Sequence, residues 1–372
     1  MNFRVFNYPI YDFLKELCYF ATQLVRIWTG SLYILRKKQH NWNVEKEELM
    51  KSFETPHSAD IWIAHRRVKP YIQRTPLLFS PTISKRTGAE IFLKMECWQF
   101  CGCFKVRGAI NMVSSLSENE RKRGLITCSS GNHGLALCYA ASLFGRPPTK
   151  VFVPMGAEPT KLNKIKMQGG EVIPFGNDYL ETLKKALAYT EESGGVFVHS
   201  HDHPLIIAGQ GTIGLEIMED LPDAESIVVP VGGGGLISGI STAVKSINPE
   251  VKLIGVEPTA APGAYLSFQD GYCHERINIR PSIADGLLGT LTPLTFSIAH
   301  QFVEEIKIVE EEAIFQAIRV FQEDEQLIVE GSAAVGLAAI LRGKIDPRGQ
   351  KIVLVLTGRN INAAQYGRII AG

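Results

Sequence analysis

From about Ser58 onward, short runs of branched hydrophobic residues alternate with longer segments whose hydrophobic positions repeat at helical spacing. Strands are predicted at 91–93, 125–127, 151–154, 172–174, 226–231, 252–256 and 351–356, and helices at 107–116, 134–144, 161–168, 179–193 and from the glycines after 231 through 246. Such alternation is typical of parallel sheets covered by helices, so the pattern predicts an α/β fold. Binding sites in these folds gather at the carboxyl ends of the strands, in the strand-to-helix turns.

The first fifty residues follow a different pattern. Residues 8–36 are rich in aromatic and branched side chains but also carry Asp12, Lys15, Glu16 and Arg26. The longest run without charge is far shorter than the roughly 20 apolar residues that cross a bilayer. A basic start and a small-residue cleavage site, which mark a signal peptide, are both missing. An amphipathic helix on a partner subunit or a membrane surface is one interpretation; a packing extension, or a mis-assigned start, is favoured over it.

Composition and charge narrow the classes of function. The chain has 372 residues, enough for two domains, and 39 basic against 38 acidic residues, a formal net charge of +1. This balance gives no electrostatic reason to expect a nucleic-acid partner. The 7 cysteines cannot all pair within the chain. Cys97, Cys101 and Cys103 cluster, but no second Cys or His pair stands at zinc-finger spacing, so we expect thiols in a reducing cytoplasm.

Four consecutive glycines, Gly232 to Gly235, lie directly between a predicted strand and a predicted helix. Glycines let the backbone adopt positive φ and bring successive N–H groups close to an anion. The helix N-terminus behind them adds partial positive charge, so a phosphate monoester is the favoured ligand. A dinucleotide with Glu257 as the ribose acid is the alternative, but no frame of the run places glycine at all three required positions.

Two further strand-to-helix turns carry candidate chemistry. Lys105 is flanked by apolar residues between a glycine turn and a helix, and burial there would lower its pKa. The neutral amine is the form that attacks a carbonyl. The turn 129–134 offers hydroxyls and backbone amides that suit a carboxylate. Alternatively, Ser129 is only an N-cap and His133 a solvated first-turn residue.

With these motifs in this order, residues 57–372 resemble the fold-type II pyridoxal-phosphate enzymes, and within them the serine and threonine dehydratases and serine racemases. The matching segments are 102–109, 129–134, 208–212, 232–235, 255–258, 284–286, 329–331 and 357–360. The resemblance implies two three-layer α/β domains with mainly parallel sheets, like tryptophan synthase β, and the cofactor between them. It implies a large domain of residues 53–120 and 203–372, a small inserted domain of 121–202, an extension of 1–52, and a homodimer or homotetramer.

The resemblance also implies roles. Lys105 would bind pyridoxal phosphate and remove the Cα proton, and Ser130 would be a second catalytic acid. The residues expected to bind the cofactor are Phe104, Lys105, Asn132, Gly232, Gly233, Gly234, Gly235, Gly286, Glu330 and Thr357, and those expected to bind substrate are Ser129, Ser130, Asn132 and His133. Asn132 would hydrogen-bond the cofactor's ring oxygen and Thr357 its pyridine nitrogen. A neutral hydroxyl there does not stabilise a protonated ring, which favours elimination.

The expected activity is that of a lyase converting a small L-hydroxy amino acid, of the threonine or serine class, to a 2-oxo acid and ammonia. Three alternatives stay open. One is an amino-acid racemase on the same fold. Another is a dehydratase of 3-hydroxyaspartate or of a hydroxyectoine-derived amino acid, because the string from Thr357 to Ile361 is similar to one in hydroxyectoine-utilisation dehydratases. The last is a non-catalytic protein that only binds the cofactor.

Some positions depart from the family's pattern. Cys103 stands where serine usually precedes Phe-Lys, and Arg359 replaces a common glycine. For the family's divalent-cation site, Glu257 and Ala261 match, but Gly263 stands where an aspartate would be. A tight Mg²⁺ site is therefore not expected, and a loosely held monovalent cation stays open.

Overall fold

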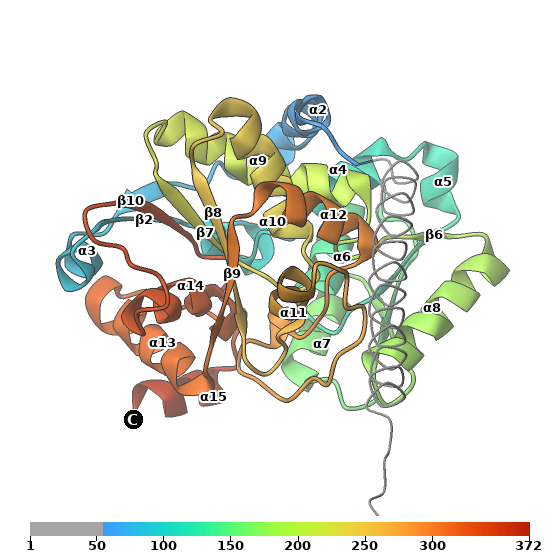
Figure 1. The fold of residues 1–372 in the computed structure, drawn as a ribbon. Helices are drawn as coiled ribbons and strands as arrows, with labels where there is room; N and C mark the ends of the chain where they lie inside the picture. Colours follow the sequence, from blue (N-terminus) through green and yellow to red (C-terminus); the bar gives the residue numbers. More distant parts are fainter. Residues whose placement is uncertain (1–54) are drawn as a thin grey trace, which may run out of the picture. The chain divides into compact units, whose positions relative to one another are not determined.

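Two β-sheets carry the fold of residues 55–372, the part of the chain that the computed structural model describes (Figure 1). The predictions for the N-terminal extension lie outside these residues. The larger sheet has the order β1-β2-β10-β7-β8-β9 and the smaller one β5-β4-β3-β6. Every strand pairing is parallel except that of β1 with β2. The predicted α/β class with mainly parallel sheets is confirmed.

The strands of the larger sheet are β1 (Leu77–Phe79), β2 (Glu90–Lys94), β7 (Ser226–Pro230), β8 (Lys252–Pro258), β9 (Glu305–Val309) and β10 (Lys351–Val355). Those of the smaller sheet are β3 (Leu125–Cys128), β4 (Thr149–Val153), β5 (Glu171–Pro174) and β6 (Val196–Phe197). The smaller sheet lies wholly within 121–202, while the domain boundaries themselves stay a prediction. The sequence pattern missed β1 and β6, which have only 3 and 2 residues, and also β9.

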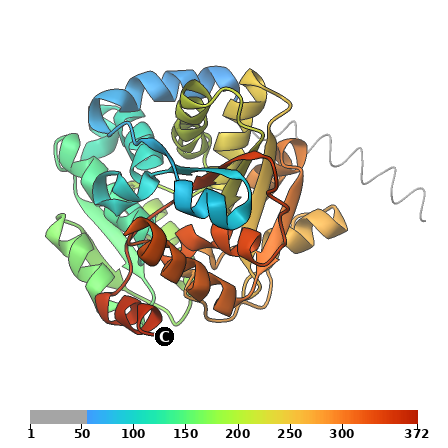
Figure 2. The same ribbon diagram turned by 90° about the vertical axis from the view of Figure 1, so that its left-hand side faces the viewer.

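Helices cover both faces of the larger sheet because successive residues of its central strands point to opposite sides. Val228 and Leu354 face a core that includes α13 (Glu311–Glu325) and α14 (Gly331–Leu341). Ile227 and Val353 face the core formed with α9 (Pro204–Asp220) and α10 (Gly235–Ile247). In Figure 2, α2 (Ser58–Val68, blue) and the C-terminal helices (red) lie on opposite sides of the fold.

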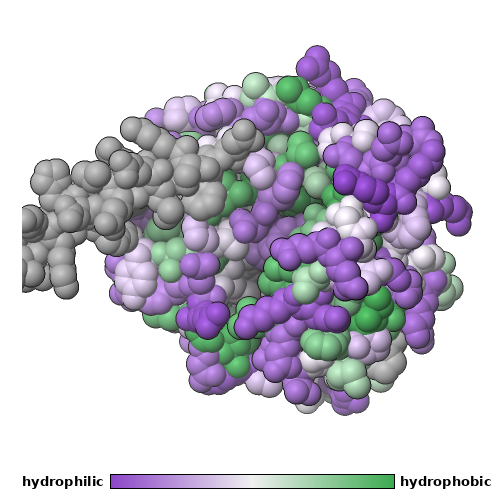
Figure 3. Space-filling view, turned by 90° about the vertical axis from the view of Figure 1, so that its right-hand side faces the viewer, coloured by the Kyte–Doolittle hydropathy of each residue, from purple (hydrophilic) through white to green (hydrophobic). Residues whose placement is uncertain are grey.

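The other helices are α3 (Pro81–Thr87), α4 (Val106–Ser115), α5 (Glu118–Lys122), α6 (Asn132–Leu143), α7 (Pro159–Met167), α8 (Tyr179–Ser193), α11 (Gly263–Asp270), α12 (Pro293–Phe302) and α15 (Ala363–Ile370). No helix within 55–372 is long and apolar enough to cross a membrane. On the face drawn in Figure 3, hydrophobic side chains are scattered among hydrophilic ones rather than gathered into one patch.

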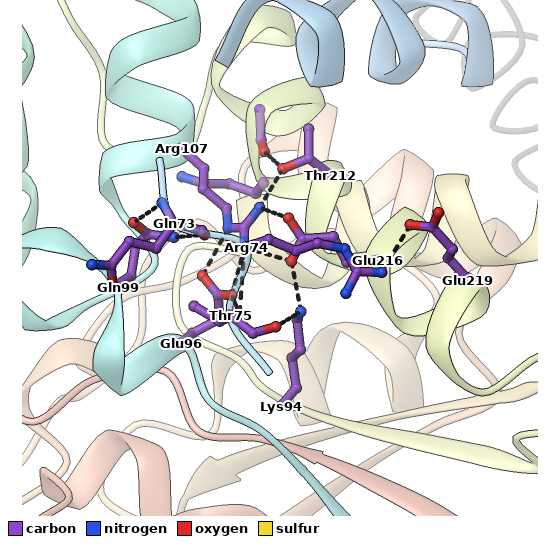
Figure 4. Close-up of polar contacts among 12 residues, drawn as sticks. Gln73, Arg74, Thr75, Lys94, Glu96, Gln99, Arg107, Thr212, Glu216 and Glu219 are labelled. Carbon is purple, nitrogen blue, oxygen red and sulfur yellow. Dashed lines mark hydrogen bonds and ion pairs between the residues drawn. The ribbon is translucent and has the colours of Figure 1, made fainter. Parts of the chain in front are cut away.

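A buried network of four charged side chains joins β2, α4 and α9 (Figure 4). The Arg107 guanidinium donates to both carboxylate oxygens of Glu96, at 2.8 and 2.7 Å, and to both of Glu216, at 2.7 and 2.8 Å. Lys94 Nζ donates to Glu216 at 2.6 Å and to the carbonyl of Thr75 at 2.7 Å. Two positive and two negative groups balance, and none of their side chains is more than 2% exposed.

This network fixes the start of α4. Arg107 lies in the first turn of the helix, whose N-cap is Lys105. On the other side of Lys105, the Phe104 N–H donates to the Thr357 carbonyl at 3.1 Å, and Cys103 forms a β-bridge with Gly358. The lysine is therefore held between a charge network and the segment that follows β10.

Replacing Arg107 should destabilise the fold strongly. Arg107→Met leaves two buried carboxylates with only one lysine between them, and breaking a buried ion pair costs about 3–5 kcal/mol. We expect a loss of this size in the free energy of unfolding, measured by urea denaturation. The matched control is Arg86→Met, which removes an ion pair with Asp324. The Arg86 side chain is 44% exposed, so this variant should lose less than about 1 kcal/mol of the free energy of unfolding. Equal losses in the two variants would contradict the assignment.

Candidate active site

Lys105 lies between the segment that follows β10 and the segment that follows β6 of the smaller sheet. Its Nζ donates to the Ser200 carbonyl at 3.0 Å and lies 5.1 Å from the centre of the Phe104 ring. Burial lowers the pKa of Lys105 to about 8, against the opposing influence of Cys103 and Glu330. Roughly a tenth of this amine is therefore uncharged at pH 7 and able to attack a carbonyl carbon, far more than for an ordinary lysine.

Thr357 follows β10 and presents a hydroxyl without a partner. Its carbonyl is taken by the Phe104 N–H, but its Oγ1 is buried and makes no hydrogen bond within residues 55–372. A buried hydroxyl in this state costs free energy unless a ligand satisfies it. The next residue must be glycine, because a Cβ at Gly358 would lie 2.5 Å from Glu330 Oε1.

The tetraglycine forms an open loop between β7 and α10. Gly234 is the N-cap of α10 with φ of 84°, which favours glycine, and no side chain caps the helix. The N–H groups of Gly232 to Gly235 donate to no other residue of the described chain. A Cβ at Gly233 would lie 2.4 Å from the His201 ring, and one at Gly232 would lie 3.1 Å from the Gly286 carbonyl. The loop thus combines close backbone approach with unpaired donors at a helix N-terminus, which suits a phosphate.

A second open helix start lies at the turn after β3. The N-cap of α6 is Gly131, which offers no side chain, so the alternative of Ser129 as N-cap is wrong. The Ser129 hydroxyl instead accepts from the Gly131 N–H at 3.3 Å, and the Ser130 hydroxyl has no partner among the described residues. Free N–H groups and a free hydroxyl are suited to a carboxylate.

His133 is not a solvated first-turn residue, and that alternative is wrong as well. It is 2% exposed, and its Nε2 donates to the Val198 carbonyl at 3.1 Å while its Nδ1 is buried without a partner. Burial, with Lys105 nearby, lowers the pKa of His133 to about 3. The ring is therefore neutral, so the charge of a bound carboxylate would be met by the helix N–H groups rather than by an imidazolium.

Asn132, Glu330 and Asn360 connect the two sheets beneath these turns. Asn132 Nδ2 donates to both oxygens of Glu330, at 2.9 and 3.1 Å, and its Oδ1 accepts from Asn360 Nδ2 at 2.8 Å. The Asn360 N–H donates to Glu330 at 3.0 Å, and burial raises the pKa of Glu330 to about 7. The amide of Asn132 is thus engaged by protein groups; its expected contact with a ring oxygen stays a prediction.

The residues that match the family's cation ligands make protein contacts in this structure, and their role as ligands stays a prediction. The Glu257 carboxylate accepts the N–H groups of Ala264 at 3.1 Å and Tyr265 at 2.7 Å, and so caps α11. Ala261 is buried beside it, and a Cβ at Gly263 would lie 2.8 Å from a Thr290 methyl. Burial raises the pKa of Glu257 to about 8, ahead of the opposing effect of these N–H groups. Within the described residues, no group of three or more His, Cys, Asp or Glu could hold a metal ion.

Sequence reasoning missed the segment from His199 to His203, which follows β6 and lies against the tetraglycine loop. Its signal was present: three histidines in five positions. His199 Nδ1 accepts the N–H groups of His201 at 3.3 Å and Asp202 at 2.8 Å, and His203 caps α9. Asn360, which links Asn132 to Glu330, carries no signal in the sequence beyond its place at the end of segment 357–360.

Three features of the site fit pyridoxal phosphate. Lys105 offers an amine for the aldehyde, the tetraglycine offers unpaired N–H groups for the phosphate, and Thr357 offers an orphaned hydroxyl for the ring nitrogen. Pyridoxal phosphate carries all three matching groups: an aldehyde, a phosphate and a ring nitrogen.

Comparison with known proteins agrees with this fit. Residues 68–358 match the family described as "Pyridoxal-phosphate dependent enzyme". An L-threonine ammonia-lyase of Thermotoga maritima is 46% identical over 84% of this chain and 77% of that protein. Among solved structures, maize serine racemase aligns with a TM-score of 0.80 at 33% identity, covering 85% of this chain and 97% of that one. A serine racemase from Dictyostelium discoideum aligns with a TM-score of 0.77 at 37% identity, covering 82% and 99%.

Lys105 should react with an amine-modifying reagent in a way that reports its lowered pKa. Because only the neutral amine reacts, the labelling rate of the cofactor-free protein should rise about tenfold per pH unit up to about pH 8 and then level off. Peptide mass spectrometry measures the rate at this position, and Lys105→Arg identifies the peptide. A rate that still climbs tenfold between pH 9 and 10 would show an ordinary lysine.

Proposed function

Because this chain belongs to the pyridoxal-phosphate dependent enzyme family, we propose that it is a lyase that removes water and ammonia from L-threonine or L-serine. The observation that carries the proposal is the buried, unpartnered hydroxyl of Thr357 beside the Lys105 segment. A neutral hydroxyl does not hold a proton on the ring nitrogen, which favours loss of the β-hydroxyl over repeated reprotonation at Cα. The L-threonine ammonia-lyase and threonine deaminase relatives support the same class.

We assign the cofactor contacts to residues that the structure leaves ready for them. Lys105 would hold pyridoxal phosphate covalently, Gly232 to Gly235 would bind its phosphate, and Thr357 would meet its ring nitrogen. Phe104 would pack against the ring, with Gly286 and Glu330 at the edge of the pocket. When bound, the cofactor supplies an electron-withdrawing ring that makes the substrate's Cα proton acidic.

The remaining steps belong to the chain's own residues. The substrate carboxylate would lie at the N-terminus of α6, near the hydroxyls of Ser129 and Ser130. Lys105, once its amine is free, would take the Cα proton, for which a pKa of about 8 is well matched near neutral pH. The hydroxyl then leaves as water, and hydrolysis of the enamine gives a 2-oxo acid and ammonia.

We also propose that the enzyme is a homodimer or homotetramer in the cytoplasm, with residues 121–202 as its inserted domain. The cytoplasm is supported by the six cysteines among the described residues, all of which are free. Light scattering of the purified protein measures the oligomeric state.

A keto-acid assay tests the function. L-Threonine, L-serine and threo-3-hydroxyaspartate are each supplied to the cofactor-loaded protein, and 2-oxo acid and ammonia should appear together. Lys105→Ala should lose about 10³-fold or more of this turnover, because the covalent anchor and the general base disappear together. The matched control is Lys85→Ala, on exposed α3, which should keep parental activity. Near-normal turnover by Lys105→Ala would overturn the proposal.

A serine or threonine racemase is the second candidate, favoured by the unpartnered hydroxyl of Ser130. If this hydroxyl reprotonates Cα on the face opposite Lys105, Ser130→Ala should abolish formation of the D-enantiomer and keep much of the elimination of the L-form. Chiral chromatography and the keto-acid assay on the same samples measure both. Loss of both activities together would make Ser130 a substrate-binding group, and D-product in excess of keto acid in the parent would make the enzyme a racemase.

A further inference from the structure

One histidine beside Lys105 has no task in the reaction as described so far. We propose that His201 is the acid that protonates the leaving hydroxyl, and that Ser200 and Tyr179 return the proton to it. This inference rests on the lyase function proposed above and adds a group to it. Ser200 and Tyr179 act through His201 and are therefore positioning residues.

His201 is held in place at the centre of the site. Its ring lies flat against Gly233, since three ring atoms would be 2.4 Å from a Cβ at that position. Its backbone N–H donates to His199 Nδ1, and the His199 ring meets its ring edge-on, with centroids 4.5 Å apart. The preceding carbonyl, that of Ser200, accepts from Lys105 Nζ at 3.0 Å. The imidazole therefore lies between the phosphate loop and the general base.

The two ring nitrogens of His201 differ in a way that suits proton transfer. Nδ1 is 2.9 Å from the Ser200 hydroxyl, whereas Nε2 makes no hydrogen bond with any described residue. The largely buried phenol of Tyr179 interacts with the Ser200 hydroxyl, while the residue as a whole is 42% exposed. Two hydroxyls with exchangeable protons thus lead from the edge of the site to the imidazole.

The neighbouring histidines lack this connection. His199 Nδ1 is occupied by two backbone N–H groups, and His133 Nε2 by a carbonyl, and neither partner can pass a proton on. Burial, followed by the influence of His199, Lys105 and His133, lowers the pKa of His201, so its ring is neutral. A neutral ring can still donate from Nε2 if Nδ1 receives a proton at the same time.

The step balances in atoms and electrons. Lys105 takes the Cα proton, the C–H electron pair becomes the Cα–Cβ double bond, and the Cβ–O pair leaves with oxygen. The proton on His201 Nε2 moves to that oxygen and completes water. The Ser200 hydroxyl proton moves to Nδ1, the Tyr179 phenol restores Ser200, and solvent restores Tyr179. Once the products have left, Nε2 takes a proton from water that enters the site, and Nδ1 returns its proton through Ser200 and Tyr179, which restores the starting ring. Hydroxide is a poor leaving group, and a positioned general acid typically contributes about 10²–10⁴-fold to such a step.

Two substrates with different leaving groups can distinguish a catalytic acid from a residue that only supports the structure. Chloride leaves without a proton, so β-chloro-L-alanine needs Lys105 but not His201. His201→Phe keeps a ring against Gly233 and should lower kcat on L-serine about 10²-fold, while kcat on β-chloro-L-alanine stays within about threefold. Ser200→Ala should shift the ratio of the two activities in the same direction. The dissociation constant for pyridoxal phosphate, measured by titration of the cofactor-free protein, should change less than about threefold.

The control is His203→Asn, which removes an imidazole from the same segment but keeps a side chain able to cap α9. It should leave the ratio of the two activities unchanged. The proposal is overturned if His201→Phe loses activity equally on both substrates or loses it on neither. If His201→Phe does not fold, an unchanged ratio of the two activities in Ser200→Ala overturns the proposal instead. Failure of the lyase function looks different, because the parent would then consume β-chloro-L-alanine but neither L-serine nor L-threonine.

Discussion

Four buried charged side chains must meet one another in this fold, because none of them is solvated by water. Removing a single charged side chain from water costs several kcal/mol, and only its partners offset that cost. Arg107, Glu96, Glu216 and Lys94 meet this condition with near-ideal distances and a net charge of zero. They come from β2, the turn after it, α4 and α9, so the network ties these elements together (Figure 4). Lys105 is two residues before Arg107, so the network also positions Lys105.

The rest of the site follows from where parallel strands end. The tetraglycine follows β7, Thr357 follows β10, and the turn 129–134 follows β3 of the other sheet. Two helix N-termini, those of α10 and α6, are left without side-chain caps, and each provides N–H groups for an anion. The link from Asn132 through Glu330 to Asn360 then holds the turn of the small sheet against the large one. These two sets of donors suit a ligand that carries a phosphate and a carboxylate.

The sequence could predict what depends on neighbours along the chain. Buried strands such as Ser226–Pro230 are continuous hydrophobic runs, and Gly232 to Gly235 mark an anion site by themselves. It could not predict contacts between distant residues. Nothing near Asn132 indicates that its amide binds Glu330, and nothing near Gly233 indicates that a histidine ring fills the space of its missing side chain. Nor does the sequence around Glu257 indicate that its carboxylate caps the helix that follows it in the chain.

Burial keeps the reacting groups of this site close to neutral. It lowers the pKa of Lys105 to about 8, keeps the imidazoles of His133 and His201 uncharged, and raises the pKa of Glu330 to about 7. Thr357 adds a hydroxyl where a carboxylate would bring a full charge. In such surroundings a lone ion is unfavourable, so protons are best moved between partners that are neutral before and after the transfer. Elimination of water fits this condition, because one proton leaves Cα for the amine while another reaches the departing oxygen. A pocket that stabilised charged groups would instead favour a long-lived anion at Cα. The neutral hydroxyl of Thr357 disfavours that chemistry.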